Sequence, residues 1–238
     1  MRALLISSSE CHPTGYLDHA EEEIRNLLGA VGRVLFLPYA LFDRDAYAER
    51  ATERFGRMGY GVDSAHAATN PARSVEEAQA VFVGGGNTFR LLKALYDLKL
   101  LEPLRQRGTN GMPYIGTSAG SNVAGVTIGT TNDMPIVQPP SFEALGLVDF
   151  NLNPHYVDPD PASTHKGETR DDRIAQFLEE NRTPVIALRE GAMLRVDGDA
   201  VTVRGTEGGR LFRRGRNAVE VGTGEDLRPL LTENIRQN

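Results

Sequence analysis

Met112-Pro113-Tyr114-Ile115-Gly116-Thr117-Ser118-Ala119-Gly120-Ser121-Asn122-Val123-Ala124 holds a serine between two glycines. We expect a short apolar strand to end near Gly116 and a helix to begin just after Ser118. So sharp a turn brings backbone segments very close together, and only glycine then fits on either side, which accounts for Gly116 and Gly120. The turn lifts the serine hydroxyl above the sheet, toward a substrate. The stretch therefore predicts a nucleophile at Ser118; a glycine-rich turn with a capping serine is the alternative.

The chain on the N-terminal side of this stretch alternates short apolar runs with longer amphipathic runs. The apolar runs predict strands over Ala3–Ser7, Arg33–Pro38, Gly61–Ser64, Ala80–Val83 and Tyr114–Gly116. The amphipathic runs predict helices over Asp18–Leu28, Asp43–Met58, Ser74–Ala78 and Thr88–Asp97. Strand followed repeatedly by helix predicts an α/β fold, with a mostly parallel sheet and helices on both faces. Such sheets bind ligands at the carboxyl ends of their strands, where Ser118 falls.

The pattern changes after residue 125. A proline-punctuated loop over residues 131–140 is followed by a predicted helix, Glu168–Glu180, and a buried strand, Pro184–Leu188. Short alternating runs over Gly191–Val221 predict antiparallel hairpins on an edge of the same sheet, and a polar helix is expected from Asp226. We find no internal repeat or linker, so a single domain is predicted for residues 1–238.

Composition excludes several classes of function. The net charge of −6 argues against a nucleic-acid surface. No apolar run approaches the length of a membrane span, and the N-terminus is too short in apolar residues for a signal peptide, so a cytoplasmic protein is expected. A single cysteine, Cys11, excludes an internal disulfide. Motifs typical of metal sites are missing, so neither a metal nor another cofactor is expected. Homo-oligomer formation is left open.

A second glycine-rich turn, Val81-Phe82-Val83-Gly84-Gly85-Gly86-Asn87-Thr88, also joins a strand to a helix. A dinucleotide site would need a glycine where the chain has Phe89, and a phosphate-binding loop would need a lysine that is missing. Two such turns on one parallel sheet should open toward one crevice. We therefore expect the N–H groups of Gly85 and Gly86, together with that of Ala119, to form an oxyanion hole.

A serine nucleophile needs a base, and His155 is the best placed of the five histidines. It follows an apolar run and Pro154, at the expected end of a strand, whereas His12 lies in a loop that could also touch the crevice. A catalytic histidine needs a carboxylate to hold its tautomer. Glu190, at the exit of a strand, and Asp133, in a loop, are both candidates. A strand end is the more rigid position, which favours Glu190.

Five segments of this chain together resemble peptidase E, the aspartyl dipeptidase family. They are Val83–Phe89, Gly116–Gly120, Thr131–Pro135, Asn153–His155 and His165–Arg170. The resemblance extends to Gly191 and is weaker beyond it. It implies a glutamine-amidotransferase-like fold with a serine nucleophile, and hydrolysis of dipeptides with N-terminal aspartate. Carried over by position, it implies Ser118 as nucleophile, His155 as base and Asp133 or Glu190 as the third member. Thr117 departs from the family, because some members carry tryptophan there.

The chemistry of Arg170 fits such a substrate, because a guanidinium presents a planar fork to a carboxylate. Lys166 and His165 lie nearby in the sequence. The alternative is a helix-surface ion pair with Glu168 or Asp171. We predict a serine exopeptidase that acts on small peptides. A cyanophycinase-like hydrolase of β-aspartyl-arginine and a non-catalytic small-molecule binding protein are the alternatives.

Overall fold

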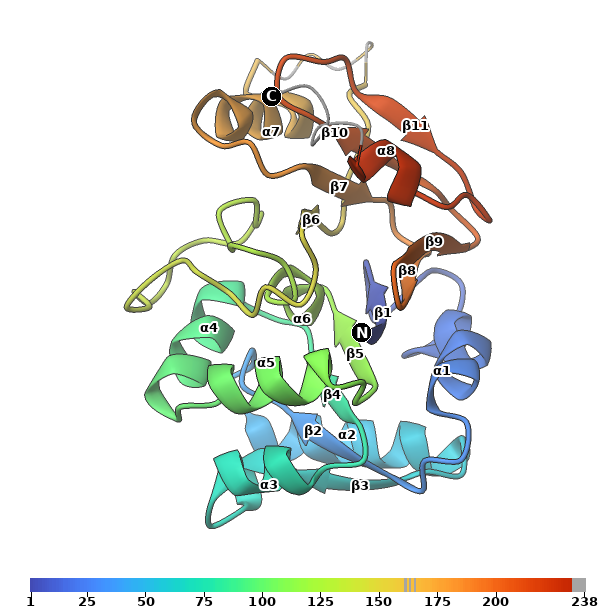
Figure 1. Cartoon of the computed structure of the whole chain (residues 1–238), viewed down its shortest axis with the longest axis vertical. Coiled ribbons are helices and arrows are strands. Elements are labelled where there is room, and N and C mark those ends of the chain that lie inside the picture. Colours follow the sequence, from blue (N-terminus) through green and yellow to red (C-terminus); the bar gives the residue numbers. More distant parts are fainter. Residues whose placement is uncertain (161, 163, 165, 233–238) are drawn as a thin grey trace.

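A computed structural model describes residues 1–160, 162, 164 and 166–232, and forms two β-sheets with packed helices (Figure 1). The larger sheet has the strand order β3-β2-β4-β5-β1-β8-β9. Its strands are β1 (Arg2–Ile6), β2 (Arg33–Leu37), β3 (Gly61–Ser64), β4 (Val81–Val83), β5 (Tyr114–Thr117), β8 (Ala192–Asp197) and β9 (Ala200–Gly205). The first five are parallel, and β8 and β9 continue the sheet antiparallel beside β1. The predicted α/β class is confirmed.

Helices cover both faces of this sheet, as the strand–helix alternation predicts. They are α1 (Glu21–Leu28), α2 (Arg44–Arg57), α3 (Pro71–Glu77), α4 (Thr88–Asp97), α5 (Leu101–Thr109) and α6 (Ala119–Asn122), with single 3₁₀ turns at Asp18–Ala20 and Ala65–Ala67. Successive strand residues point to opposite faces. Leu4 and Ile6 therefore pack with α1 and α2, while Leu5 joins the core under α4 and α5.

The C-terminal hairpins correct one prediction. Only β8 and β9 extend the first sheet. A separate four-stranded sheet, in the order β11-β10-β7-β6, is formed by β6 (Asn151–Asn153), β7 (Val185–Leu188), β10 (Gly209–Phe212) and β11 (Val219–Val221). The glycines at the start of β10 make this possible. A Cβ on Gly209 would lie 2.2 Å from the carbonyl oxygen of Ala187, so only glycine allows β10 to pair with β7 there.

The helices also differ from the prediction in detail. α5 was not predicted; its Pro103 lies in the first helical turn, where the missing N–H costs little. α3 begins at Pro71, three residues before the predicted start, because the Asn70 side chain accepts a hydrogen bond from the Arg73 amide at 3.1 Å and caps it. α7 (Arg170–Glu180) and α8 (Arg228–Thr232) lie beside the second sheet. The helix predicted from Asp226 is thus found over Arg228–Thr232, and residues 233–238 lie outside the described residues.

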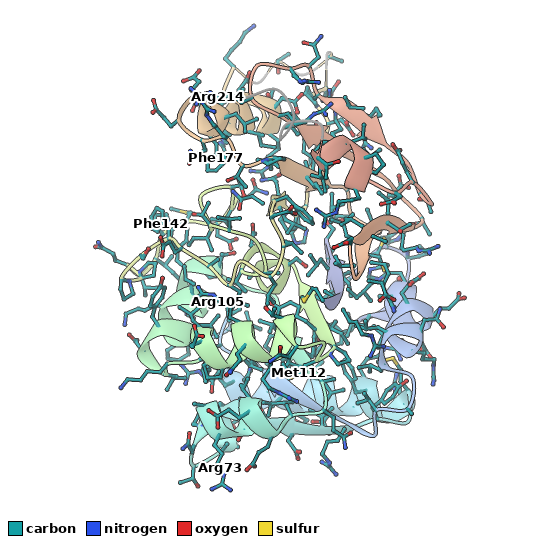
Figure 2. The ribbon with its side chains drawn as sticks, viewed as in Figure 1. Arg73, Arg105, Met112, Phe142, Phe177 and Arg214 are labelled. Atoms are coloured by element: carbon teal, nitrogen blue, oxygen red, sulfur yellow. The ribbon has the colours of Figure 1, made fainter. Side chains whose placement is uncertain are left out.

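A long loop, residues 123–150, joins α6 to the second sheet and is fixed to the helices beneath it (Figure 2). The Arg105 guanidinium donates hydrogen bonds to the carbonyl oxygens of Leu145 and Ala144, at 2.8 and 2.9 Å. The ring of Phe142 packs edge-on against Phe89 of α4, with centroids 5.8 Å apart. These contacts hold the loop, which carries Asp133, in place above α4.

The two sheets share a hydrophobic core. Leu5 and Val83 of the first sheet belong to the same buried cluster as Ile186 and Leu211 of the second. The single domain expected for residues 1–238 stays a prediction. Within the part of the chain that is described, no helix has the length and apolar character needed to cross a membrane.

Substitution of Gly120 with alanine is expected to destabilise the fold. A Cβ there would lie 2.1 Å from the carbonyl oxygen of Val83, so α6 would have to move away from β4. We expect the free energy of unfolding, measured in urea, to fall by about 3 kcal/mol or more. Gly56→Ala in α2 is the matched control. Its Cβ would have nothing within 4 Å, so its stability should be unchanged or slightly raised. Equal stability of the two variants would contradict this account.

Candidate active site

The candidate site lies where the carboxyl ends of strands from both sheets meet. β4, β5 and β1 are neighbours in the first sheet, and β6 and β7 are parallel neighbours in the second. Ser7, directly after β1, joins the two sheets: its hydroxyl donates to the carbonyl oxygen of Leu188 at 2.8 Å and accepts from the amide of His155 at 2.9 Å. The buried Ser7 thus fixes the chain after β6 relative to the end of β7.

Ser118 sits on a strained turn between β5 and α6. Its φ of 49° and ψ of −107° are unfavourable for a residue with a side chain. Its amide donates to the carbonyl oxygen of Ile6 at 3.0 Å. The Ser121 hydroxyl donates to Ile6 and Gly116 carbonyl oxygens, at 2.8 and 2.9 Å, and so holds the turn from below. The surrounding hydrogen bonds therefore maintain the strain that directs the Ser118 hydroxyl outward.

Ser118, His155 and Glu190 form a continuous hydrogen-bonded line. Nε2 of His155 lies 2.9 Å from Oγ of Ser118, and Nδ1 lies 2.9 Å from Oε1 of Glu190. His155 has a φ of 54°, a second strained backbone position at the same site. The side chains of His155 and Glu190 are 41% and 58% exposed, so water reaches the site. The arrangement allows the imidazole to take a proton from the hydroxyl while the carboxylate balances the resulting charge.

The structure places Asp133 near this line but not in it. Oδ2 of Asp133 accepts a hydrogen bond from the amide of Thr88, the first residue of α4, at 2.7 Å. Among the described residues, the carboxylate that bonds to His155 is that of Glu190. Asp133 nevertheless lines the hollow in front of Ser118.

Gly85 and Gly86 line the same hollow, opposite His155. The amides on either side of them donate to carbonyl oxygens in and after β2, but the amides of Gly85 and Gly86 donate to no backbone carbonyl of the described chain. A Cβ on Gly85 would lie 3.1 Å from Cβ of Ser118, and one on Gly86 would lie 2.7 Å from the carbonyl oxygen of Ala40. The loop therefore approaches the serine as closely as glycine allows. The Ala119 amide, at the start of α6, lies on the other side of the turn.

The hollow has a volume of about 340 Å³ and an edge of aromatic and charged side chains. Burial raises the pKa of Tyr16 and Tyr47, so neither phenol can act as a base at neutral pH. Arg50 stacks over the Tyr16 ring, 4.2 Å from its centroid, and pairs with Glu10.

Known proteins share both the sequence and this fold. The sequence profile of peptidase family S51 matches residues 3–204. The chain belongs to peptidase family S51. It is 52% identical over 231 residues to a Streptomyces coelicolor protein named "Peptidase E", covering 97% of this chain and 95% of the relative. It is 47% identical over 231 residues to a Drosophila melanogaster protein named "Probable alpha-aspartyl dipeptidase", covering 96% of each. The predicted resemblance is thereby confirmed.

A solved structure of an S51-like fold agrees with the architecture. The crystal structure of a peptidase from an acI-B1 actinobacterium superposes with a TM-score of 0.68 at 19% identity, covering 94% of this chain and 95% of that one. At this identity the likeness shows the fold alone. Thr117, where the sequence departs from some family members, is fully buried beside the turn that carries Ser118.

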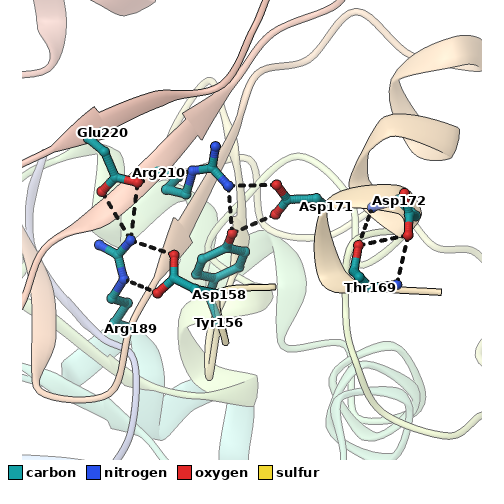
Figure 3. A network of polar contacts seen from close by, with 8 residues as sticks. All are labelled: Tyr156, Asp158, Thr169, Asp171, Asp172, Arg189, Arg210 and Glu220. Atoms are coloured by element: carbon teal, nitrogen blue, oxygen red, sulfur yellow. Dashed lines mark hydrogen bonds and ion pairs between the residues drawn. The ribbon is translucent and has the colours of Figure 1, made fainter. Parts of the chain in front are cut away.

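The structure does not bring Arg170 into the hollow of Ser118. It is the first residue of α7, whose start is fixed by Thr169 and Asp172, each of which caps the other (Figure 3). Arg170 lines a second hollow of about 380 Å³, together with residues 157–160. These residues begin two positions after His155, and none of them lines the hollow of Ser118. Lys166 is exposed, and His165 lies outside the described residues.

The ion pairs considered as the alternative for Arg170 are made elsewhere. Glu168 pairs with Arg173, at 3.8 Å, and Asp171 pairs with Arg210, at 2.6 Å. Within the described residues Arg170 has no acidic partner. Burial and, secondarily, the charge of Arg173 lower the pKa of Arg170, as expected for a cation without a carboxylate beside it.

A polar network holds the outer side of this S51 site (Figure 3). Arg189 donates to both carboxylate oxygens of Asp158, at 2.6 and 2.7 Å, and Arg210 donates to Asp171 and to the hydroxyl of Tyr156, at 2.6 and 3.0 Å. The Arg189 guanidinium holds the pKa of Asp158 below its usual range. The carboxylate of Glu220 on β11 joins the two arginines.

Members of this network are sequence neighbours of the candidate site residues. Tyr156 follows His155, and Arg189 precedes Glu190. The pairing of Arg189 with Asp158 therefore joins the histidine loop to the end of β7. Sequence reasoning did not find these residues, because their partners come from strands of the second sheet. It also missed the role of Ser7, which is the last residue of the predicted strand Ala3–Ser7 but lies just after β1 in the structure.

No group of three or more His, Cys, Asp or Glu side chains in residues 1–160, 162, 164 and 166–232 is placed to hold a metal ion.

Proposed function

We propose that this S51 peptidase is an aspartyl dipeptidase that cleaves dipeptides with N-terminal aspartate through an acyl-enzyme on Ser118. The line from Ser118 through His155 to Glu190, with contacts of 2.9 Å each, carries this proposal. The names of the Streptomyces and Drosophila relatives support the substrate class.

In the proposed mechanism, Oγ of Ser118 attacks the carbonyl carbon of the aspartyl residue, and Nε2 of His155 takes its proton. The tetrahedral intermediate collapses when the imidazolium returns this proton to the leaving amine, which breaks the peptide bond. Water then attacks the aspartyl ester with His155 again as base, and releases aspartate and free Ser118. Glu190 stabilises the imidazolium in both half-reactions.

The amides of Gly86 and Ala119 are proposed to stabilise the oxyanion, with that of Gly85 as a further donor. Fixed backbone N–H groups stabilise negative charge that develops only in the transition state. Neither the Gly85 amide nor the Gly86 amide donates to a backbone carbonyl oxygen of the described chain, so both are available for this role. The amide of Ala119 lies next to the nucleophile at the start of α6, as this role requires.

We propose that Arg170 binds the aspartyl carboxylate of the substrate. Arg170 lines the second hollow and not that of Ser118, so this role requires its guanidinium to turn toward the substrate. Arg170→Gln should lower kcat/KM for Asp-Leu by about 10- to 100-fold, mostly through KM, because a charge-assisted contact to substrate is lost. Stability should not change, since Arg170 has no ion pair among the described residues to lose. Arg182→Gln, an exposed arginine just beyond the end of α7 that lines neither hollow, is the matched control and should retain wild-type kinetics. Equal KM values for the two variants would contradict this role.

A substrate panel tests the proposed function directly. Hydrolysis of Asp-Leu, measured by release of free leucine, should far exceed hydrolysis of Asn-Leu or Leu-Leu. Preference for β-Asp-Arg over Asp-Leu would instead support a cyanophycinase-like hydrolase. Binding of these peptides without turnover of any of them would support a non-catalytic binding protein.

A further inference from the structure

We infer that Asp133 binds the α-ammonium group of the dipeptide and so restricts the site to substrates with a free N-terminus. This inference rests on the proposed function, because it concerns how the same site holds an aspartyl dipeptide. It gives the loop of residues 130–135 a role in substrate recognition that is separate from the transfer of the proton.

Bond geometry limits where such a group can lie. The α-nitrogen of the first residue is two bonds from the carbonyl carbon that Ser118 attacks, and is therefore only ~2.5 Å from it. Its binding partner must line the same hollow as Ser118. Asp133 does so, together with His155 and Gly86. A buried or half-buried ammonium group also needs a counter-charge, and a carboxylate supplies one.

The other carboxylates near this hollow are already paired. Glu190 is bonded to His155, and Glu10 is paired with Arg50. Asp133, by contrast, accepts a hydrogen bond from an uncharged group, the Thr88 amide, through Oδ2 alone. No hydrogen bond within the described residues reaches its Oδ1. One oxygen thus anchors the side chain, and the other is available for a ligand.

The position of Asp133 holds its carboxylate in place. Its Oδ2 meets the first amide of the ten-residue helix α4, where the helix dipole favours a negative charge. The amide of Asp133 donates to Oγ1 of Thr131 at 3.2 Å, and the neighbouring Asn132 donates to the carbonyl oxygen of Pro154 at 2.8 Å. The loop is thereby joined to the residue just before His155. Capping α4 would not by itself require a charged side chain at position 133, since asparagine can accept the same amide hydrogen bond.

A pair of matched ligands tests this inference. N-succinyl-leucine is Asp-Leu in which a hydrogen replaces the α-ammonium group. Both ligands are titrated by calorimetry into the Ser118→Ala protein, which should bind without turnover, and into the Ser118→Ala/Asp133→Asn protein. We expect Asp133→Asn to weaken the binding of Asp-Leu by about 10- to 100-fold and to leave the binding of N-succinyl-leucine unchanged.

Ser118→Ala/Asp43→Asn is the matched control, because Asp43 also accepts an amide hydrogen bond at a helix start, at 3.0 Å, but does not line the hollow of Ser118. It should bind both ligands as the parent does. Unchanged N-succinyl-leucine binding also shows that the Asp133 variant is folded. If Asp133→Asn does not fold, Asp133→Ser, which keeps an acceptor oxygen, replaces it.

Equal weakening of the two ligands, or no weakening of Asp-Leu, would overturn the inference. Neither of these two results would affect the proposed function, provided that the wild-type protein hydrolyses Asp-Leu. Failure of that chain to hydrolyse Asp-Leu, or of its Ser118→Ala form to bind it, would overturn the proposed function and the inference with it.

Discussion

Replacing Ser118 with alanine is expected to lower kcat for Asp-Leu by about 10⁴-fold or more. The hydroxyl is the atom that forms the acyl-enzyme in our proposal, and alanine removes it without changing the backbone. KM should change little, because the groups proposed to bind the two ends of the substrate remain. The loss belongs to the chemical step, so it should appear in kcat measured at saturating Asp-Leu.

Stability provides the control for this variant. Since the Ser118 side chain bonds only to His155 among the described residues, the urea unfolding curve should be nearly unchanged. Ser74→Ala, at a half-buried position of α3 that does not line the hollow of Ser118, should retain full activity. An alanine variant at position 118 that keeps near-wild-type turnover would eliminate an acyl-enzyme on this residue.

Glu190→Gln is expected to lower kcat by about 10²- to 10⁴-fold. A neutral amide no longer balances the charge on the imidazolium, and its NH₂ group can donate to Nδ1 of His155. That hydrogen bond favours the tautomer of His155 that carries its proton on Nε2. In this tautomer Nε2 cannot accept the proton of the Ser118 hydroxyl. The partial exposure of Glu190 lets water replace some of the lost stabilisation, so the lower half of this range is expected.

Asp133→Asn is the comparison that makes this prediction specific. If Glu190 orients His155, Glu190→Gln should reduce kcat for Asp-Leu with little change in KM, whereas Asp133→Asn should act mainly by raising KM. The opposite pattern, with kcat for Asp-Leu lost only in Asp133→Asn, would assign the third position of the triad to Asp133.

The sequence predicted the parts of this structure that depend on local backbone geometry. Gly116 and Gly120 are needed where α6 approaches β5 and β4, and this close approach follows from the turn itself. Parallel strands place their carboxyl ends at one edge, so His155 and Glu190 could be proposed from strand ends alone. The choice between Glu190 and Asp133 could not be made with certainty, because it depends on which loop comes near the histidine in space.

The second sheet was missed for a related reason. β10 pairs with β7 rather than with β9, and the short alternating runs of these strands are compatible with either pairing. The close approach at Gly209 is recognisable only once the partner strand is known. The network of Arg189, Asp158 and Arg210 depends on this pairing and could not be anticipated either. Arg170, predicted to bind the substrate, lines a second hollow rather than that of Ser118, and its role stays a proposal.

The most direct test of the central claim is to locate the site of covalent modification. The unmodified protein is treated with a serine-reactive fluorophosphonate, digested and mapped by mass spectrometry while hydrolysis of Asp-Leu is followed in parallel. We predict one adduct per chain, on Ser118, formed in proportion to the loss of activity and not formed in the His155→Ala protein. Complete loss of activity with Ser118 unlabelled, or full activity with Ser118 labelled, would contradict the account.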